Sequence, residues 1–239
     1  MRKVQNIFKS QLINSFNWLF PNRCQSCQQV LTDHRAAYCD PCYLLLPFQS
    51  NCCNQCGQTF AGLTDHCGRC LASPPNFDAC FCPFRYEQPL RNQIIRFKYG
   101  ERPELALGLA RTLAHEIEAN QLPTPELLIP VPQHISRLRQ RGFNQSLLLV
   151  KELSKLLEIP YSNNIIEKHR PTKPQAEQSL RQRKSNLRNC FRITAKDLPK
   201  HIAIVDDVFT TGTTASEITK ILKRNGVDYV QVWGLAHTI

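Results

Sequence analysis

Beyond residue 76, short continuous apolar runs alternate with segments whose apolar residues recur at helical spacing. The runs predict buried strands and the spaced segments predict helices. In chain order these are helix 89–99, helix 103–121, strand 127–131, helix 144–158, strand 163–167, strand 201–205, helix 214–225 and strand 229–236. Alternating strands and helices are typical of an α/β sheet, and the last three elements predict a parallel βαβ unit.

The first 20 residues carry basic side chains and no acid, and their apolar residues recur near a helical period. This predicts an amphipathic helix over 1–20, which packs on the protein's own surface or binds a membrane surface or a partner. Lys9, Gln11 and Asn14 interrupt the apolar stretch that a secretory signal needs, and no run reaches the roughly 18 residues of a membrane span. We therefore expect a cytoplasmic protein without a transmembrane segment, in which thiols stay reduced.

Eight of the twelve cysteines form four Cys-x2-Cys turns within residues 24–70. Two such turns aim four thiolates at one tetrahedral ion, so the repeat predicts two closed, structural zinc sites in a double zinc ribbon. Disulfides and iron–sulfur clusters are the less favoured alternatives. The predicted ligands are Cys24, Cys27, Cys39 and Cys42 in the first site and Cys53, Cys56, Cys67 and Cys70 in the second.

Some details of these sites stay open at the level of sequence. Cys52 could replace Cys53 with an x3 spacing, and His34 or His66 could replace a thiol. The remaining cysteines have no partner at a useful spacing and are expected to be ordinary buried residues: Cys80, Cys82 and Cys190.

Consecutive prolines predict a linker over 72–76. We therefore expect three parts, which are an N-terminal helix over 1–20, a zinc-ribbon domain with its linker over 21–76, and an α/β domain over 77–239.

The chain carries 30 Lys and Arg against 19 Asp and Glu, a net charge of +11 that favours phosphate-bearing partners. Nearly all of this excess lies in two segments. The first follows the strand at 127–131 and contains Arg137, Arg139 and Arg141. The second, 168–192, carries eight basic residues against Glu177. Arginine forks suit phosphate oxygens, and ordinary solvated surface is the alternative for both segments.

The strand at 201–205 leads into Asp206 and Asp207 and then into four threonines around a glycine. Open α/β sheets bind ligands outside the carboxyl ends of their strands, and backbone N–H groups at a helix N-terminus bind phosphate. The two carboxylates would repel that phosphate, so we expect them to bind sugar hydroxyls, with a divalent cation on the far side of the sugar. The predicted phosphate-binding residues are Thr210, Thr211, Gly212, Thr213 and Thr214.

Residues 205–214 resemble the phosphoribosyl pyrophosphate (PRPP) loop of type I phosphoribosyltransferases. With the cysteine turns and the Arg141-Gly-Phe-Asn-Gln145 sequence, the chain resembles the ComF family, including its GntX-like members. The resemblance implies a type I phosphoribosyltransferase fold, in which helices flank a twisted, mainly parallel sheet, with the small double zinc-ribbon domain before it. It also implies that Asp206 and Asp207 are catalytic residues that hold ribose hydroxyls, and that Mg2+ binds with PRPP.

The same resemblance implies two further groups of site residues. Pyrophosphate would bind at the loop after strand 127–131, and a long flexible loop would close over bound PRPP. The expected pyrophosphate-binding residues are Val131, Pro132, Arg137 and Arg141, and the expected flexible-loop residues are Arg170, Thr172, Gln175, Arg183 and Asn186.

Two functions are compatible with these features. The first is a phosphoribosyltransferase that transfers the phosphoribosyl group from PRPP to an acceptor and releases pyrophosphate. The second is a PRPP-sensing protein without turnover that binds single-stranded DNA, in which Phe97, Tyr99 and Phe143 stack on bases or serve only as core residues. The ComF family is associated with natural competence, so imported single-stranded DNA and other competence proteins, such as a DNA translocase, are the expected partners.

Overall fold

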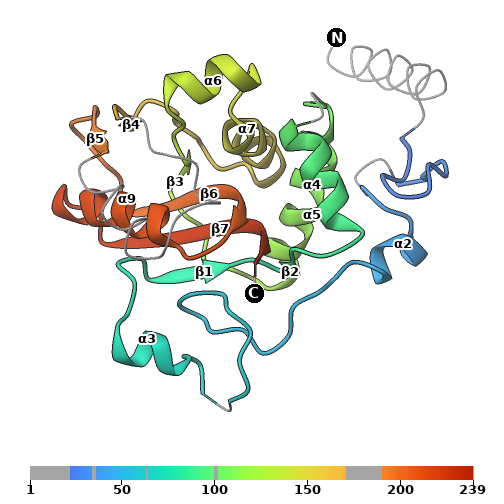
Figure 1. Cartoon of the computed structure of the whole chain (residues 1–239), viewed down its shortest axis with the longest axis horizontal. Coiled ribbons are helices and arrows are strands. Elements are labelled where there is room, and N and C mark those ends of the chain that lie inside the picture. The colour runs from blue at the N-terminus through green and yellow to red at the C-terminus, as the bar shows by residue number, and fades with distance from the viewer. Residues whose placement is uncertain (1–21, 34–35, 63, 100–101, 171–189, 239) are drawn as a thin grey trace, which may run out of the picture. The chain divides into compact units, whose positions relative to one another are not determined.

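The computed structural model describes residues 22–33, 36–62, 64–99, 102–170 and 190–238 (Figure 1). By their packing these residues form two compact units, one up to Leu46 and one from Pro47 onward. The expected helix over 1–20 and most of the expected flexible loop lie outside the described residues. Within the described part of the chain, no helix is both long enough and apolar enough to cross a membrane.

A parallel sheet forms the centre of the larger unit. Its strand order is β1–β7–β6–β3, and β2 pairs with β7 beyond the end of β1. A separate antiparallel pair is formed by β4 and β5. The strands are β1 (Ala79–Phe81), β2 (Phe84–Arg85), β3 (Leu127–Pro130), β4 (Ile166–Lys168), β5 (Phe191–Ile193), β6 (His201–Phe209) and β7 (Tyr229–His237).

Helices cover both faces of this sheet. Ile202 and Ile204 of β6 share a buried cluster with Ile218 and Leu222 of α9. Helices α5 and α7 also pack on the sheet but contribute nothing to that cluster, so they cover the other face. The helices are α2 (Asp40–Leu44) in the smaller unit and α3 (Gly68–Ala72), α4 (Leu90–Tyr99), α5 (Leu105–Ala119), α6 (Ile135–Arg141), α7 (Gln145–Leu157) and α9 (Thr213–Arg224) in the larger one.

The predicted fold class is confirmed, with small shifts at the ends of the elements. The main difference is β6, which was expected to end at Val205 and runs on to Phe209 because its pairing with β7 continues to His237. Strands β1, β2 and β5 and helix α6 were not predicted as separate elements. Asn144 caps α7 as expected, and its side chain accepts a hydrogen bond from the Leu147 N–H.

Each unit contains one cluster of four cysteines with the predicted membership, and the four sulfur atoms of each cluster lie within 4.8 Å of one another. Sulfur atoms bound to one tetrahedral zinc at about 2.3 Å would be about 3.8 Å apart. The Cys27–Cys39 and Cys56–Cys67 sulfur pairs, at 3.6 and 3.7 Å, fit that spacing. Cys52 stands outside the second cluster, so Cys53 is the ligand.

The first cysteine of each cluster has a lowered thiol pKa, which favours the thiolate that binds a cation. Burial acts to raise the pKa of Cys53, but backbone hydrogen bonds, including one from the Cys67 N–H at 3.3 Å, outweigh it and lower the pKa to about 7. Cys24 is equivalent in the first cluster, where backbone hydrogen bonds outweigh burial and lower the pKa to about 6. Burial and neighbouring thiols instead raise the pKa of Cys42 to about 12. A bound Zn2+ removes this mutual repulsion, since it stabilises all four thiolates.

The second ribbon is joined to the edge of the sheet. The Cys80 N–H of β1 donates to the Asn54 carbonyl at 3.1 Å, and a Cβ on Gly57 would lie 3.1 Å from the Cys80 sulfur. Gln49 donates to the Cys82 carbonyl at 2.6 Å. The predicted boundary at 72–76 stays a prediction, and the packing places this ribbon in the same compact unit as the sheet.

We expect the purified protein to hold two zinc ions per chain, one for each cysteine cluster. The Cys67→Ser variant should lose one of them and lower the stability of the larger unit, because a closed zinc site supplies folding free energy. Metal analysis and thermal unfolding measure both effects. Cys190→Ser is the control, since Cys190 is a buried thiol outside either cluster and its replacement should release no zinc. One zinc or none in the intact wild-type protein would contradict the assignment.

Candidate functional site

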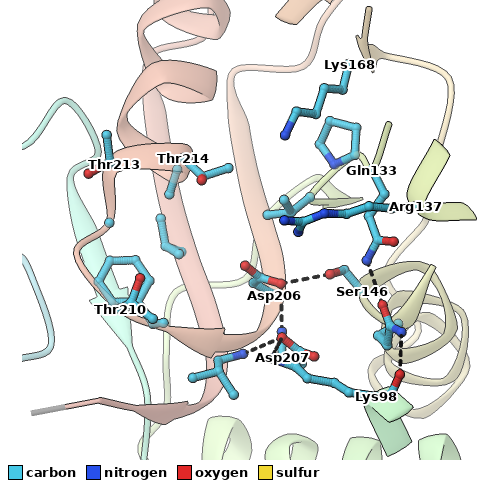
Figure 2. Close-up of a pocket in the computed structure, with 18 of the residues that line it drawn as sticks. Lys98, Gln133, Arg137, Ser146, Lys168, Asp206, Asp207, Thr210, Thr213 and Thr214 are labelled. Atoms are coloured by element: carbon cyan, nitrogen blue, oxygen red, sulfur yellow. Dashed lines mark hydrogen bonds and ion pairs between the residues drawn. The ribbon is translucent and has the colours of Figure 1, made fainter. Parts of the chain in front are cut away.

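A cavity of about 400 Å³ opens at the carboxyl ends of β3 and β6 (Figure 2). Its walls come from segments far apart in sequence, which are the end of α4, the loop after β3 with α6, the first turn of α7, the end of β4 and the β6–α9 loop. The cavity contains an acidic centre, a threonine-rich side and a basic side.

The threonine-rich side is the turn from β6 into α9. Gly212 caps α9 with a φ of +68°, a conformation that favours glycine. A Cβ at this position would lie 2.6 Å from the Phe209 ring and 3.2 Å from the Phe77 ring, so a side chain would also clash. The first N–H groups of α9 have no partner within the helix, and no acid stands in its first turn. The lining residues on this side are Thr210, Thr211, Gly212, Thr213 and Thr214.

Asp206 and Asp207 form the acidic centre, and their side chains have different partners. Asp206 Oδ1 accepts hydrogen bonds from the Ser146 hydroxyl at 2.8 Å and the Asp207 N–H at 2.9 Å. Asp207 Oδ1 accepts from the Val208 N–H at 2.7 Å and lies 3.0 Å from the Lys98 ammonium. Burial and the charge of Asp207 raise the pKa of Asp206 to about 7, although Lys98 and Ser146 oppose the shift.

The basic side lies opposite the threonines. In Figure 2 the side chains of Arg137 and Lys168 point into the cavity from the side away from Thr213 and Thr214. Burial and the nearby charge of Arg137 lower the pKa of Lys168. Arg137 and Lys168 thus bring two positive charges close together where Lys168 is partly shielded from water. A bound anion would stabilise both charges.

Gln145 is a buried side chain that joins three walls of the cavity. Its Oε1 accepts from Gln133 Nε2 at 2.6 Å and from Arg141 Nη1 at 3.4 Å, and its Nε2 donates to the Lys98 carbonyl at 3.4 Å. Asn144, next to it, donates to the Val131 carbonyl at 3.1 Å. The first turn of α7 therefore fixes the loop after β3.

An aromatic residue stands at the margin of the same cavity. Tyr99 is 66% exposed, and the Arg141 guanidinium lies 4.8 Å from the centre of its ring. Phe97 is fully buried and packs on Phe143 at 6.0 Å. Of the three aromatic residues singled out from the sequence, Tyr99 alone has a largely exposed ring.

The cavity brings together the predicted acidic pair, the predicted phosphate loop and Val131, Pro132, Arg137 and Arg141. Arg170 is exposed and does not line it, and Thr172, Gln175, Arg183 and Asn186 lie outside the described residues. Sequence reasoning missed Lys98, Ser146 and Lys168 as site residues. Ser146 and Gln145 follow the predicted Asn144 cap, so the predicted start of α7 was a usable signal for both.

Among solved structures the chain is similar to adenine phosphoribosyltransferases. The enzyme from Trypanosoma brucei, in complex with AMP, pyrophosphate and ribose-5-phosphate, is 19% identical with a TM-score of 0.40, covering 67% of this chain and 70% of that one. The enzyme from Thermoanaerobacter pseudethanolicus is 18% identical with a TM-score of 0.34, covering 56% and 80%.

Sequence relatives give a firmer result. Residues 15–71 match the double zinc ribbon domain family. Competence protein F of Haemophilus influenzae is 36% identical over 235 residues, covering 94% of this chain and 99% of that protein. DNA utilization protein YhgH of Salmonella typhi is 36% identical over 223 residues, covering 92% and 98%. Competence protein ComFC of Streptococcus pneumoniae is 24% identical, covering 80% and 90%. Because this likeness extends over nearly the whole length of both chains, the protein belongs to the competence protein F family, which includes the DNA utilization protein YhgH.

Proposed function

We propose that this protein binds PRPP in the cavity and serves the uptake or utilization of DNA. The observation that carries the proposal is an acidic pair, of which Asp207 is buried and Asp206 partly buried, between two groups of anion-binding elements in one cavity. A ligand with phosphate at both ends and hydroxyls between them fits that order of charges. The printed names of the relatives, competence protein and DNA utilization protein, support the cellular role.

In this proposal each part of PRPP has its own partners. The 5′-phosphate binds the N–H groups and hydroxyls of Thr210–Thr214, as phosphates do at helix N-termini. The ribose hydroxyls donate to the carboxylate of Asp206. The pyrophosphate binds the loop after β3 with Arg137 and Lys168, whose two charges stabilise a polyphosphate better than either does alone.

Mg2+ is expected to enter with the ligand. Both carboxylates that line the described cavity already have hydrogen-bonding or cationic partners, so they form no open cage for a metal. Mg2+ keeps several waters and binds readily to substrate phosphates, and on the pyrophosphate it would neutralise negative charge.

The site supports transfer of the phosphoribosyl group to an acceptor. In such a transfer the bond from ribose C1 to the pyrophosphate oxygen breaks and a bond from C1 to the acceptor forms. Arg137 and Lys168 would stabilise the leaving pyrophosphate, and the fixed ribose and phosphate contacts would hold C1 in place. Release of pyrophosphate from Mg-PRPP in the presence of candidate acceptors separates an enzyme from a PRPP-sensing protein.

Single-stranded DNA binding is a second candidate function, favoured by the exposed ring of Tyr99 beside Arg141. Aromatic rings next to cations bind unpaired bases in many single-strand-binding proteins. The exposed Arg139 on α6 and the basic segment at 168–192 would contact the phosphate backbone. This function is compatible with PRPP binding, and imported strands or a DNA translocase would then be the partners.

Replacing Asp206 and Asp207 together by Asn should lower the affinity for Mg-PRPP about a hundredfold or more, because the charged carboxylate that accepts both ribose hydroxyls is lost. Isothermal calorimetry measures the effect, and zinc content checks the fold. Asp228→Asn is the control, since this residue lies in an exposed ion pair with Lys200 outside the cavity. Unchanged PRPP affinity in the double variant would remove the basis of the proposal.

PRPP affinity should fall about tenfold between pH 8 and pH 6. The pKa of Asp206 is about 7, so lowering the pH protonates the carboxylate and removes its charge. Calorimetry with the wild type and with Asp206→Asn separates this effect from the titration of the ligand's own phosphates. An equal loss in both proteins would show that Asp206 does not accept hydrogen bonds from the ligand.

For the second function, we expect Tyr99→Ala to weaken binding of a single-stranded oligonucleotide by about 1–3 kcal/mol and Tyr99→Phe to leave it nearly unchanged, because stacking needs the ring and not the hydroxyl. Arg139→Gln should reduce the salt dependence by about 0.7 logarithmic units for its one lost phosphate contact. Fluorescence anisotropy at several salt concentrations measures both. Full binding by Tyr99→Ala would exclude Tyr99 as a stacking platform.

A further inference from the structure

Lys98 and Asp207 form a largely buried ion pair in the cavity, and neither residue contacts the ligand in the proposed binding mode. The Lys98 ammonium lies 3.0 Å from Asp207 Oδ1, and the two side chains are only 18% and 8% exposed (Figure 2). Lys98 comes from the end of α4, more than a hundred residues before the acidic pair. The paired charges contact the cavity directly, since both residues line it.

The position of Lys98 is fixed from its backbone as well as from its side chain. The Lys98 carbonyl accepts from Gln145 Nε2 at 3.4 Å, and Gln145 is held in turn by Gln133 at 2.6 Å. Gln145 is 1% exposed, so these hydrogen bonds are largely protected from water. The end of α4 is thereby joined to the first turn of α7 and to the loop after β3.

Strand geometry sends the two carboxylates to different partners. Side chains alternate along a strand, so the consecutive Asp206 and Asp207 leave β6 on opposite sides, and Asp206 meets the Ser146 hydroxyl of α7. Asp207 points to the opposite face, where Lys98 meets it. One oxygen of Asp207 is therefore already occupied by an ammonium and by the Val208 N–H.

The charges of the site explain why such a cation is needed. Two neighbouring carboxylates would repel a ligand that carries phosphates at both ends, and one positive charge cancels half of that repulsion. Burial acts to lower the pKa of Lys98, but the carboxylates of Asp207 and Asp206 outweigh it and raise the pKa, so the ammonium stays charged.

We propose that Lys98 is a positioning residue that engages Asp207, so that Asp206 alone accepts the ribose hydroxyls and the net charge of the acidic centre is low enough to admit a diphosphorylated sugar. The inference rests on the proposed PRPP function. It assigns unequal roles to the two aspartates, whereas the resemblance to phosphoribosyltransferases implies the same role for both.

The test measures PRPP affinity by calorimetry in four variants, which are Lys98→Met, Lys98→Arg, Asp207→Asn and the double variant Lys98→Met with Asp207→Asn. Lys98→Met leaves the Asp207 charge buried without a partner and should weaken binding about tenfold or more. Lys98→Arg keeps the charge and should bind within about threefold of the wild type. The double variant removes both charges and should bind more tightly than Lys98→Met alone.

The double variant decides the proposal. If Asp207 binds the sugar directly, its loss adds to the loss of Lys98, and the double variant binds more weakly than either single variant, which would overturn the inference. Equal weakening by Lys98→Arg and Lys98→Met would overturn the role of the charge. Should Lys98→Met fail to fold, as judged by zinc content and thermal unfolding, the double variant is compared with Asp207→Asn instead. Because Lys98 acts only through Asp207, the two should bind alike, and much weaker binding by the double variant would overturn the inference.

Two further measurements complete the design. Lys155→Met is the matched control, because Lys155 forms an exposed ion pair with Glu152 outside the cavity and its loss should leave PRPP binding unchanged. Failure of the wild type to bind Mg-PRPP would contradict the proposed function. Normal binding by the wild type and by Lys98→Met together would contradict only the role of Lys98.

Discussion

The pairing of β6 with β7 beyond Val205 is the constraint on which the site depends. Asp206 lies opposite Gly234 in this parallel register, and Phe209 lies opposite His237. A Cβ on Gly234 would lie 3.0 Å from the Cys82 sulfur, so a side chain here would crowd the residue that follows β1. Because the backbone is extended through the acidic pair, its two carboxylates cannot turn toward one partner. A loop at this point would leave them free to do so.

Electrostatics inside the cavity follow from that geometry. Asp206 is held by the Ser146 hydroxyl and Asp207 by the Lys98 ammonium, so each carboxylate has a neutral or positive partner from a different helix. The opposite wall contributes Arg137 and Lys168, and burial together with the charge of Arg137 lowers the pKa of Lys168. The cavity therefore carries positive charge on one wall and negative charge at its centre. This pattern favours a ligand that is anionic at its ends and neutral in its middle.

The second zinc ribbon packs against strands β1 and β2 of the same sheet. Its turns approach the sheet so closely that the Cys80 sulfur would meet a Cβ on Gly57, and the Pro47 carbonyl accepts from the Arg85 N–H at 2.7 Å. Phe48 also packs on Phe84, with ring centres 5.0 Å apart. The ribbon therefore covers an edge of the sheet that would otherwise expose unpaired backbone groups. The zinc that holds the ribbon together thus also supports strands β1 and β2.

Local patterns were enough to predict several features. Apolar runs predicted β3, β6 and β7, cysteine spacing predicted both four-cysteine clusters, and the side chain of Asn144 identified the start of α7. Each depends on neighbouring residues, and such signals are present in the chain before it folds. The β6–α9 loop was recognisable for the same reason, since its acids, threonines and glycine are consecutive.

Tertiary structure decided what depends on contacts between distant segments. No local pattern showed that β6 continues through the acids, because that extension comes from the pairing with β7. The role of Lys98 was equally hidden, since a lysine at the end of an amphipathic helix is ordinary there. Only packing brings the Lys98 ammonium within 3.0 Å of Asp207, across a sequence separation of more than a hundred residues. The sequence by itself thus determined the elements and the residue types of the site, while long-range packing decided which charges meet.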